Sequence, residues 1–133
     1  VWSGEVVEHH SEFINWTGFK SYPVPQGIPV IIGGTKGKVH QRVAAHGDGW
    51  FLPVDTPVAL AEHLAPLAAA CAAVGRDPAT VEISCMWNMQ GGLDAIQAFE
   101  AAGVGRIIVP VLALGNDPVA GLTHLSESVI SKC

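Results

Sequence analysis

The sequence predicts an α/β protein of about four parallel βα units, which is half of a (β/α)₈ TIM barrel. Four times, a short apolar or β-branched run closed by Gly, Pro or Asn is followed by residues with helical spacing. These runs are PVIIGG, GWFLP, TVEISCMWN and RIIVPV. A whole barrel typically needs ~250 residues, whereas this chain has 133. Right-handed crossovers place consecutive parallel strands side by side, so we expect part of a barrel wall.

The residues before the first of these runs have no regular period. They mix aromatic residues, Pro and Gly, and Pro23 and Pro25 favour extended backbone. We therefore expect an irregular connecting segment over residues 1–27 and the four βα units over residues 28–133.

The first unit opens with an apolar run from Ile28 to Ile32 that shows almost no alternation, as expected for a strand covered on both faces. Gly33 and Gly34 end this strand. Thr35 is the predicted N-cap of a short helix, and Gly47 ends that helix.

The second unit has a short strand from Gly49 to Leu52. Its helix begins with Thr56 as N-cap and Pro57 at the first helical position. Apolar residues then recur at spacings of three and four as far as Gly75, and Pro66 is expected to bend or split the helix.

The last two units follow the same plan. Strands are predicted from Val81 to Trp87 and from Arg106 to Val111. The third helix runs from about Leu93 to Ala102, and Asp117 or Pro118 opens the fourth.

Composition indicates a globular domain rich in core residues. Apolar residues make up 49% of the chain and charged residues 14%, which argues against a disordered chain. The net charge of −5 and the scattered Lys and Arg argue against nucleic-acid binding. No apolar run reaches the ~18 residues of a membrane span, and no signal peptide is recognisable. The three cysteines fit neither a zinc site nor a disulfide framework, so we expect a cytoplasmic protein with reduced thiols.

The segment from Gly33 to Lys38, GGTKGK, is the candidate anion site. It follows a strand and precedes a helix, so its backbone N–H groups would lie beside the positive end of a helix dipole. Gly33 and Gly34 permit close approach of a ligand, Thr35 can donate a hydroxyl hydrogen bond, and Lys36 or Lys38 can add positive charge. The spacing matches neither a Walker A loop nor G-x-G-x-x-G. A plain βα turn without a ligand is the alternative.

Trp87 and Asn88 follow the third strand, at the end of the sheet where such barrels bind ligands. An indole and an amide there can line a pocket for a planar ring. Alternatively, Trp87 caps the core and Asn88 orders the turn. The segment from Asp48 to Trp50 lies at the opposite end of its strand, so a structural role is expected for it.

No metal site is predicted. His9 and His10 lie beside Glu8 and Glu12, but adjacent histidines point in different directions and no second cluster is tied to them by spacing. The other histidines fall on predicted helices, where exposed or capping roles are commoner than catalysis. These are His40, His46, His63 and His124. Catalytic residues are not identified from the sequence.

The chain resembles the luciferase-like monooxygenases, a family of flavin- or deazaflavin-dependent oxidoreductases built on a (β/α)₈ barrel. Three segments carry the resemblance: PVPQGIPVIIGGTKGKVHQRVAAHGDGWFLP over 23–53, VGRDPATVEIS over 74–84 and AGVGRIIV over 102–109. They match the family's fifth to eighth βα units in order and spacing. The resemblance therefore implies the C-terminal half of the barrel.

The resemblance implies that Gly33, Gly34 and Thr35 help to bind the phosphate of the cofactor. The branch of the family that uses coenzyme F420 is the more similar one, and FMN is the alternative. The implied reaction is hydride transfer between a small-molecule substrate and F420, or monooxygenation with FMN. The second interpretation is a non-catalytic half-barrel that binds at most an anion.

In the family, the first four units supply part of the ring pocket and commonly the catalytic histidine, and this chain does not contain them. The two outer strands would also leave unpaired edges, which natural proteins cover. We therefore expect a homodimer, association with the N-terminal half, or a fragment of a longer chain. The isolated chain need not be active.

Overall fold

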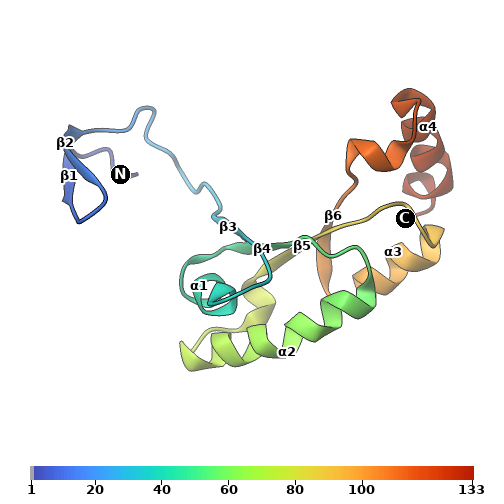
Figure 1. Ribbon diagram of the computed structural model, residues 1–133, viewed down its shortest axis with the longest axis horizontal. Helices are drawn as coiled ribbons and strands as arrows, with labels where there is room; N and C mark the ends of the chain where they lie inside the picture. Colours follow the sequence, from blue (N-terminus) through green and yellow to red (C-terminus); the bar gives the residue numbers. More distant parts are fainter. Residues whose placement is uncertain (1) are drawn as a thin grey trace.

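The computed structural model describes residues 2–133 and confirms the α/β class. The parallel sheet has the strand order β3-β4-β5-β6. Its strands are β3 (Ile31–Gly33), β4 (Gly49–Leu52), β5 (Glu82–Met86) and β6 (Val104–Ile108). A helix follows each strand (Figure 1): α1 (Val39–His46), α2 (Pro57–Ala73), α3 (Gly92–Ala101) and α4 (Pro118–Ser128). The prediction of four parallel βα units in sequential order is therefore confirmed.

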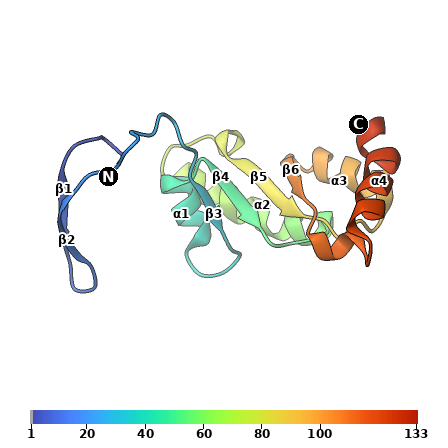
Figure 2. The ribbon, with the colours of Figure 1, turned by 90° about the horizontal axis from the view of Figure 1, so that it is seen from above.

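Three short 3₁₀ helices complete the connections. They are η1 (Pro78–Thr80), η2 (Val111–Leu114) and η3 (Ile130–Lys132). Seen from above, the four strands lie side by side, with α3 and α4 beside β6 at the end of the sheet opposite β3 (Figure 2). Within residues 2–133, no helix is both long and apolar enough to cross a membrane.

The core lies between the sheet and the helices. Alternate residues of β4 and β5 face the helices and are almost fully buried, because side chains in a strand alternate between its two faces. Trp50, Leu52 and Cys85 are 0% exposed, and Val39 and Val43 of α1 are equally buried. Burying side chains of this size stabilises the fold by about 1.5–3 kcal/mol each. Val39 and Val43, which lie one helical turn apart on α1, therefore form part of this core.

Residues 1–27, expected to be irregular, contain an antiparallel hairpin instead. Its strands are β1 (Val7–His10) and β2 (Asn15–Phe19). At the turn, the backbone N–H and the hydroxyl of Ser11 both donate to the carbonyl of Ile14, at 3.0 and 3.1 Å. A register shift in β1 breaks the regular alternation, so the strands leave no clean period of two in the sequence.

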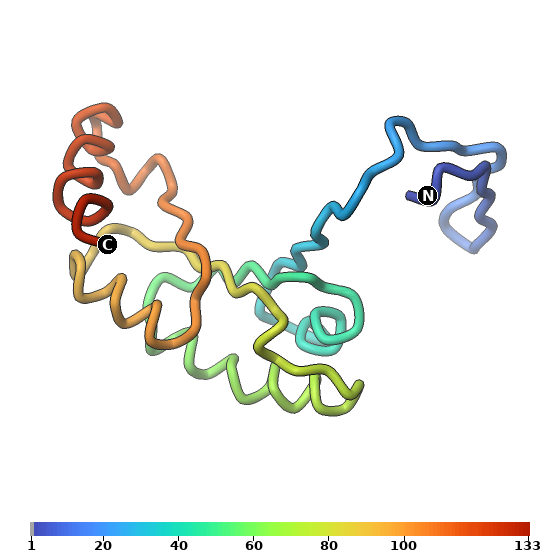
Figure 3. The backbone as a smooth tube through the Cα atoms, turned by 180° about the vertical axis from the view of Figure 1, so that it is seen from behind, coloured from blue at the N-terminus to red at the C-terminus, as the bar shows by residue number. Residues whose placement is uncertain are grey.

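The hairpin stands apart from the sheet. An extended segment joins β2 to β3, and all views place the hairpin and the C-terminus at opposite ends of the molecule (Figure 3). Residues 2–27 therefore do not contribute a strand to the parallel sheet.

The outer strands differ from their predicted bounds. β3 begins at Ile31 instead of Ile28, because its partner β4 begins only at Gly49, which pairs with Ile31. β6 begins at Val104 and ends at Ile108, and Pro110 then becomes the N-cap of η2. A proline has no N–H to continue a strand ladder, which accounts for the early end of β6.

Two helix predictions were also wrong. The N-cap of α1 is Lys38, without a side-chain cap bond, so Thr35 lies in the preceding turn. Pro66 was expected to bend or split the second helix; α2 runs unbroken from Pro57 to Ala73, so Pro66 does not split it. The start of α2 is as predicted, since the Thr56 hydroxyl accepts a hydrogen bond from the Ala59 N–H at 3.2 Å.

Asp48 and Gly49 join α1 to the sheet and hold the first two strands together. The Asp48 carboxylate accepts from the Val30 N–H at 2.8 Å, and the Asp48 N–H donates to the Val30 carbonyl at 2.8 Å. A Cβ on Gly49 would lie only 2.7 Å from Ile31 Cδ1 and 2.9 Å from the Glu82 carbonyl oxygen. Only glycine allows the three strands to approach this closely, so this segment has the expected structural role.

Arg76 holds the carboxyl end of α1. Its Nη1 donates to the carbonyl oxygens of Val43, Ala44 and Gly47 at 3.2, 3.3 and 2.6 Å. Its Nε also donates to the Thr80 hydroxyl at 2.8 Å. A cation on the last carbonyls of a helix satisfies them and offsets the negative end of the dipole. One side chain thus ties α1 to the turn between α2 and β5.

Replacing Arg76 with Ala is expected to lower the free energy of unfolding by about 2–4 kcal/mol, because several charge-assisted hydrogen bonds are lost and the half-buried carbonyls of Ala44 and Gly47 lose this partner. Urea unfolding followed by circular dichroism measures this change. Arg42→Ala, on the exposed face of α1, is the control and should change it by less than about 0.5 kcal/mol. Equal losses in the two variants would contradict the role of Arg76.

Candidate functional site

The candidate site lies at the carboxyl ends of β3, β4 and β5. Because these strands are parallel neighbours, the loops that follow them emerge at one edge of the sheet. The loops are residues 34–38, residues 53–56 and residues 87–91. The first of them is the GGTKGK segment, and the third begins with Trp87 and Asn88.

Both backbone polar groups of Gly34 form hydrogen bonds within the protein. Its N–H donates to the carbonyl of Phe51 at 3.1 Å, which extends the pairing of β3 with β4 by one step. Its carbonyl accepts from the indole Nε1 of Trp50 at 2.8 Å. The φ angle of Gly34 is +110°, and a Cβ there would meet nothing within 4 Å. Glycine is therefore required for backbone conformation at this position, and its N–H is not free for a ligand.

The bond from Trp50 also sets the direction of the next amide. In a trans peptide the C=O and the following N–H point in opposite directions, so the N–H of Thr35 points away from Trp50 and the core. Within residues 2–133, none of the N–H groups from Thr35 to Lys38 donates a hydrogen bond to the protein. This loop therefore presents a run of unpaired N–H donors.

The surroundings of these donors favour an anion. The loop leads directly into α1, whose first turn has no acidic residue. The side chains of Lys36 and Lys38 are exposed in the same loop. Successive free N–H groups at the positive end of a helix form an anion-binding concavity. The residues present thus fit a phosphate group, with Thr35, Lys36 and Lys38 as the polar side chains beside it.

Trp87 and Asn88 occupy different environments. Trp87 is 1% exposed, packs in the core and donates its Nε1–H to the Gln90 carbonyl at 2.8 Å. It therefore corresponds to the alternative in which it caps the core. Asn88 donates to the Asp55 carboxylate at 3.2 Å and accepts from the Gln90 N–H at 3.0 Å. Asn88 thus joins the loops after β4 and β5, at the edge that carries the GGTKGK segment.

Three rings, from α1, β4 and α2, pack together in a cluster that was not predicted from the sequence. Trp50 of β4 lies edge-on to His40 of α1, with ring centroids 5.0 Å apart. His63 of α2 lies 5.8 Å from each of these two rings. The sequence placed each histidine on a helix, but their approach depends on how α1 packs against α2. Hydrophobic periodicity in the sequence does not indicate which residues of two helices come into contact.

His40 has an unusual environment for a histidine. Its Nε2 is buried and has no hydrogen-bond partner in the described part of the chain. Burial, and secondly the neighbouring His63, lower the pKa of His40 below its ordinary value. His40 is therefore neutral at pH 7, and its ring contacts the indole that holds Gly34.

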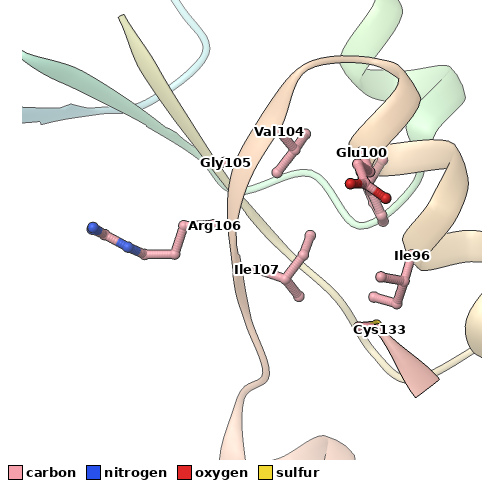
Figure 4. A pocket seen from close by; sticks show the side chains of 8 residues that line it. Ile96, Glu100, Val104, Gly105, Arg106, Ile107 and Cys133 are labelled. Carbon is pink, nitrogen blue, oxygen red and sulfur yellow. The ribbon is translucent and has the colours of Figure 1, made fainter. Parts of the chain in front are cut away.

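Two cavities lie between β6 and the helical segments that pack against it. One, of about 230 Å³, is bordered by Ile96, Val104, Ile107 and Cys133, whereas the Arg106 side chain extends to the other side of the strand (Figure 4). There Arg106 pairs with Glu82 at 2.8 Å. The second cavity, of about 200 Å³, has an apolar lining that includes Trp87, Ile107 and Leu125. Neither cavity contains a residue of the GGTKGK loop.

The histidines of the hairpin do not gather with other possible ligands. His9 packs against the ring of Trp16, with centroids 5.8 Å apart. Over residues 2–133, no three side chains of His, Cys, Asp or Glu are grouped so that they could hold a metal ion.

Replacing Trp50 with Phe keeps most of the ring but removes the donor to Gly34. We expect the free energy of unfolding to fall by about 1–3 kcal/mol, because the Gly34 carbonyl loses its partner. Hydrogen exchange should also show weaker protection of the Gly34 N–H. Trp87→Phe is the matched control, since it removes the same kind of bond at the Gln90 carbonyl. Equal protection of the Gly34 N–H in the two variants would contradict this role for Trp50.

Comparison with known proteins places this geometry in a family. No curated protein matches the chain. Among solved structures, an F420-dependent secondary alcohol dehydrogenase in complex with an F420-acetone adduct matches with a TM-score of 0.75 and 12% identity. That match covers 98% of this chain and 57% of the other, so the chain spans little more than half of that protein. DmoA from Hyphomicrobium sulfonivorans matches with a TM-score of 0.47 and 16% identity, over 95% of this chain and 27% of the other.

The match to the F420-dependent secondary alcohol dehydrogenase shows a similarity of fold. A family model described as luciferase-like monooxygenase matches residues 1–109, which is most of the chain. The matched residues include the GGTKGK loop, the Trp50 cluster and Asn88. The chain therefore belongs to the luciferase-like monooxygenase family.

Proposed function

We propose that this chain is the coenzyme-phosphate-binding half of an oxidoreductase that uses coenzyme F420, with FMN as the alternative coenzyme. The observation that carries the proposal is the run of unpaired N–H groups from Thr35 to Lys38 at the amino end of α1. Membership of the luciferase-like monooxygenase family supports a flavin or deazaflavin over other phosphate-containing ligands. The similar F420-dependent secondary alcohol dehydrogenase supports F420 and a small-molecule substrate.

Each part of the loop has a distinct task in this proposal. Gly33 and Gly34 bring the backbone to the carboxyl end of β3 without side chains in the way of the phosphate. Thr35 offers its N–H and its hydroxyl, and Lys36 offers a positive charge. Asn88, fixed by Asp55, lies at the same edge and is positioned to contact a more distant part of the coenzyme. Trp87 acts indirectly, by holding the turn that carries Asn88.

The coenzyme would supply the redox chemistry, either hydride transfer with F420 or monooxygenation with FMN. The contribution of this chain is binding and orientation. The Trp50 bond keeps the carbonyl dipole of Gly34 away from the phosphate, so that no acceptor competes with the N–H donors. Such preorganised donors bind an anion without having to reorient on binding.

A ligand pair that differs only in the phosphate tests the proposal. FMN is expected to bind at least about tenfold more tightly than riboflavin, because only FMN reaches the N–H groups of the loop. F420 is expected to bind more tightly than its deazaflavin fragment without phosphate. Quenching of ligand fluorescence measures these affinities. Equal affinities for FMN and riboflavin, or no binding of any of these ligands, would contradict the proposal.

A variant pair separates the loop from general effects on the fold. Gly34→Asp places a negative charge and a side chain at φ +110°, and FMN binding is expected to fall at least about tenfold. Gly115→Asp makes the same change at a second positive-φ glycine with open space around it, outside the loop. That control is expected to bind FMN as the wild type does.

We also propose that the open edges of the sheet are covered in the functional protein. β3 and β6 each pair on one side only within residues 2–133. Ile31 on β3 and Ile108 on β6 are 38% and 40% exposed. Unpaired edges with apolar side chains favour association. The chain would then dimerise or pair with the four N-terminal βα units that the family has.

A concentration series tests this association. Light scattering coupled to size-exclusion chromatography is expected to give the mass of a dimer for the isolated chain, and Ile31→Lys combined with Ile108→Lys is expected to shift the mass to that of a monomer. Leu112→Lys, at a residue 94% exposed on η2, is the control and should leave the mass unchanged. A well-folded monomer at every concentration would argue against dimerisation and leave the N-terminal units as the partner to test by co-expression.

A further inference from the structure

The ring cluster beneath the GGTKGK loop links the candidate site to a titratable group. His40 is the second residue of α1, so it lies in the first turn of the helix whose amino end faces the loop. Its ring contacts Trp50, and Trp50 donates to the Gly34 carbonyl. Two contacts therefore separate the imidazole from the turn that presents the N–H donors.

We propose that binding of a divalent anion at the GGTKGK loop is coupled to protonation of His40. This inference rests on the proposed function of the loop. A dianion at the amino end of α1 would lie near the first turn, where a charge acts most strongly on helix groups. Protonated His40 would be attracted to it, and the neutral form would not.

The structure holds no other group that would favour the protonated form. α1 packs against β3, which has no titratable side chain, and against α2, which carries Glu62 and His63. Within residues 2–133, neither Glu62 nor any other carboxylate forms an ion pair with His40. The buried Nε2 of His40 has no acceptor.

The remaining charged groups nearby oppose protonation. Lys36 and Lys38 in the loop, Arg42 on α1, and His63 when charged all add positive charge to this corner of the fold. Burial, and secondly His63, lower the pKa of His40 in the free chain. A bound dianion would act in the opposite direction, because it attracts the protonated form.

The sign of the effect follows from linkage. If anion binding raises the pKa of His40, binding takes up a proton, and by reciprocity affinity for the anion increases as the pH falls. The gain is about tenfold for each unit by which the pKa rises. Affinity should be lowest where His40 is neutral in both states and highest where it is protonated in both.

Sulfate is the appropriate probe, because it remains a dianion throughout the range in which histidine titrates, whereas a phosphate monoester does not. Calorimetry from about pH 8 to about pH 5 covers the ordinary pKa of histidine and the region below it, toward which the pKa of free His40 is lowered. The wild type is expected to bind sulfate more tightly at the lower pH, and His40→Gln is expected to lose most of that dependence while still binding sulfate. His124→Gln, on α4, is the matched control for the loss of one imidazole and should behave as the wild type.

NMR provides a readout that does not depend on a variant. The Hε1 signal of His40 in the wild type should titrate at higher pH when sulfate is present. Adding sulfate should leave the Hε1 signal of His124 unchanged at each pH. Sulfate binding with the same affinity at all pH values in the wild type would overturn the coupling and leave the loop as an anion site. Absence of sulfate binding at any pH would overturn both the coupling and the proposed phosphate loop.

Discussion

The hydrogen bond from the Trp50 indole to the Gly34 carbonyl is the constraint on which the candidate site depends. It uses a fully buried side chain, so the donor has no water to compete for it. This bond fixes the Gly34 carbonyl toward the core, so the N–H of Thr35 points outward. The loop therefore presents N–H donors on its outer side and not the Gly34 carbonyl. A residue on β4 thereby determines what the loop after β3 can bind.

The two ends of α1 differ in whether other residues of the protein satisfy their backbone groups. At the carboxyl end, the Arg76 guanidinium contacts the carbonyls of Val43, Ala44 and Gly47. At the amino end there is no cap from a side chain and no acidic residue in the first turn. The protein thus stabilises the negative end of this helix dipole from within and leaves the positive end open. This asymmetry is what an anion-binding helix requires.

The sequence predicted the features that short stretches of residues specify. It did not predict the features that depend on how the helices and strands pack. The strand Gly49–Leu52 and the Thr56 cap were predicted at the correct residues, because short-range patterns specify them. Thr35 was misplaced as a cap, since three residues without a periodic pattern separate it from Val39, where α1 begins. The contact of His40 with His63 joins residues 23 positions apart through the packing of α1 on α2. Such a contact has no signature in a single sequence.

The position of the site at the edge of the sheet connects binding to assembly. β3 has three residues, pairs only with β4 among residues 2–133, and leads directly into the loop. Its register is held by Asp48 and by the close approach at Gly49, both at its amino end, and by the Gly34 contacts at its carboxyl end. A strand this short gains much of its stability from neighbours on both sides. A partner strand on the open edge would therefore tighten the loop that we propose as the anion site. An anion on the loop would in turn favour that partner, because coupling between two binding events is reciprocal.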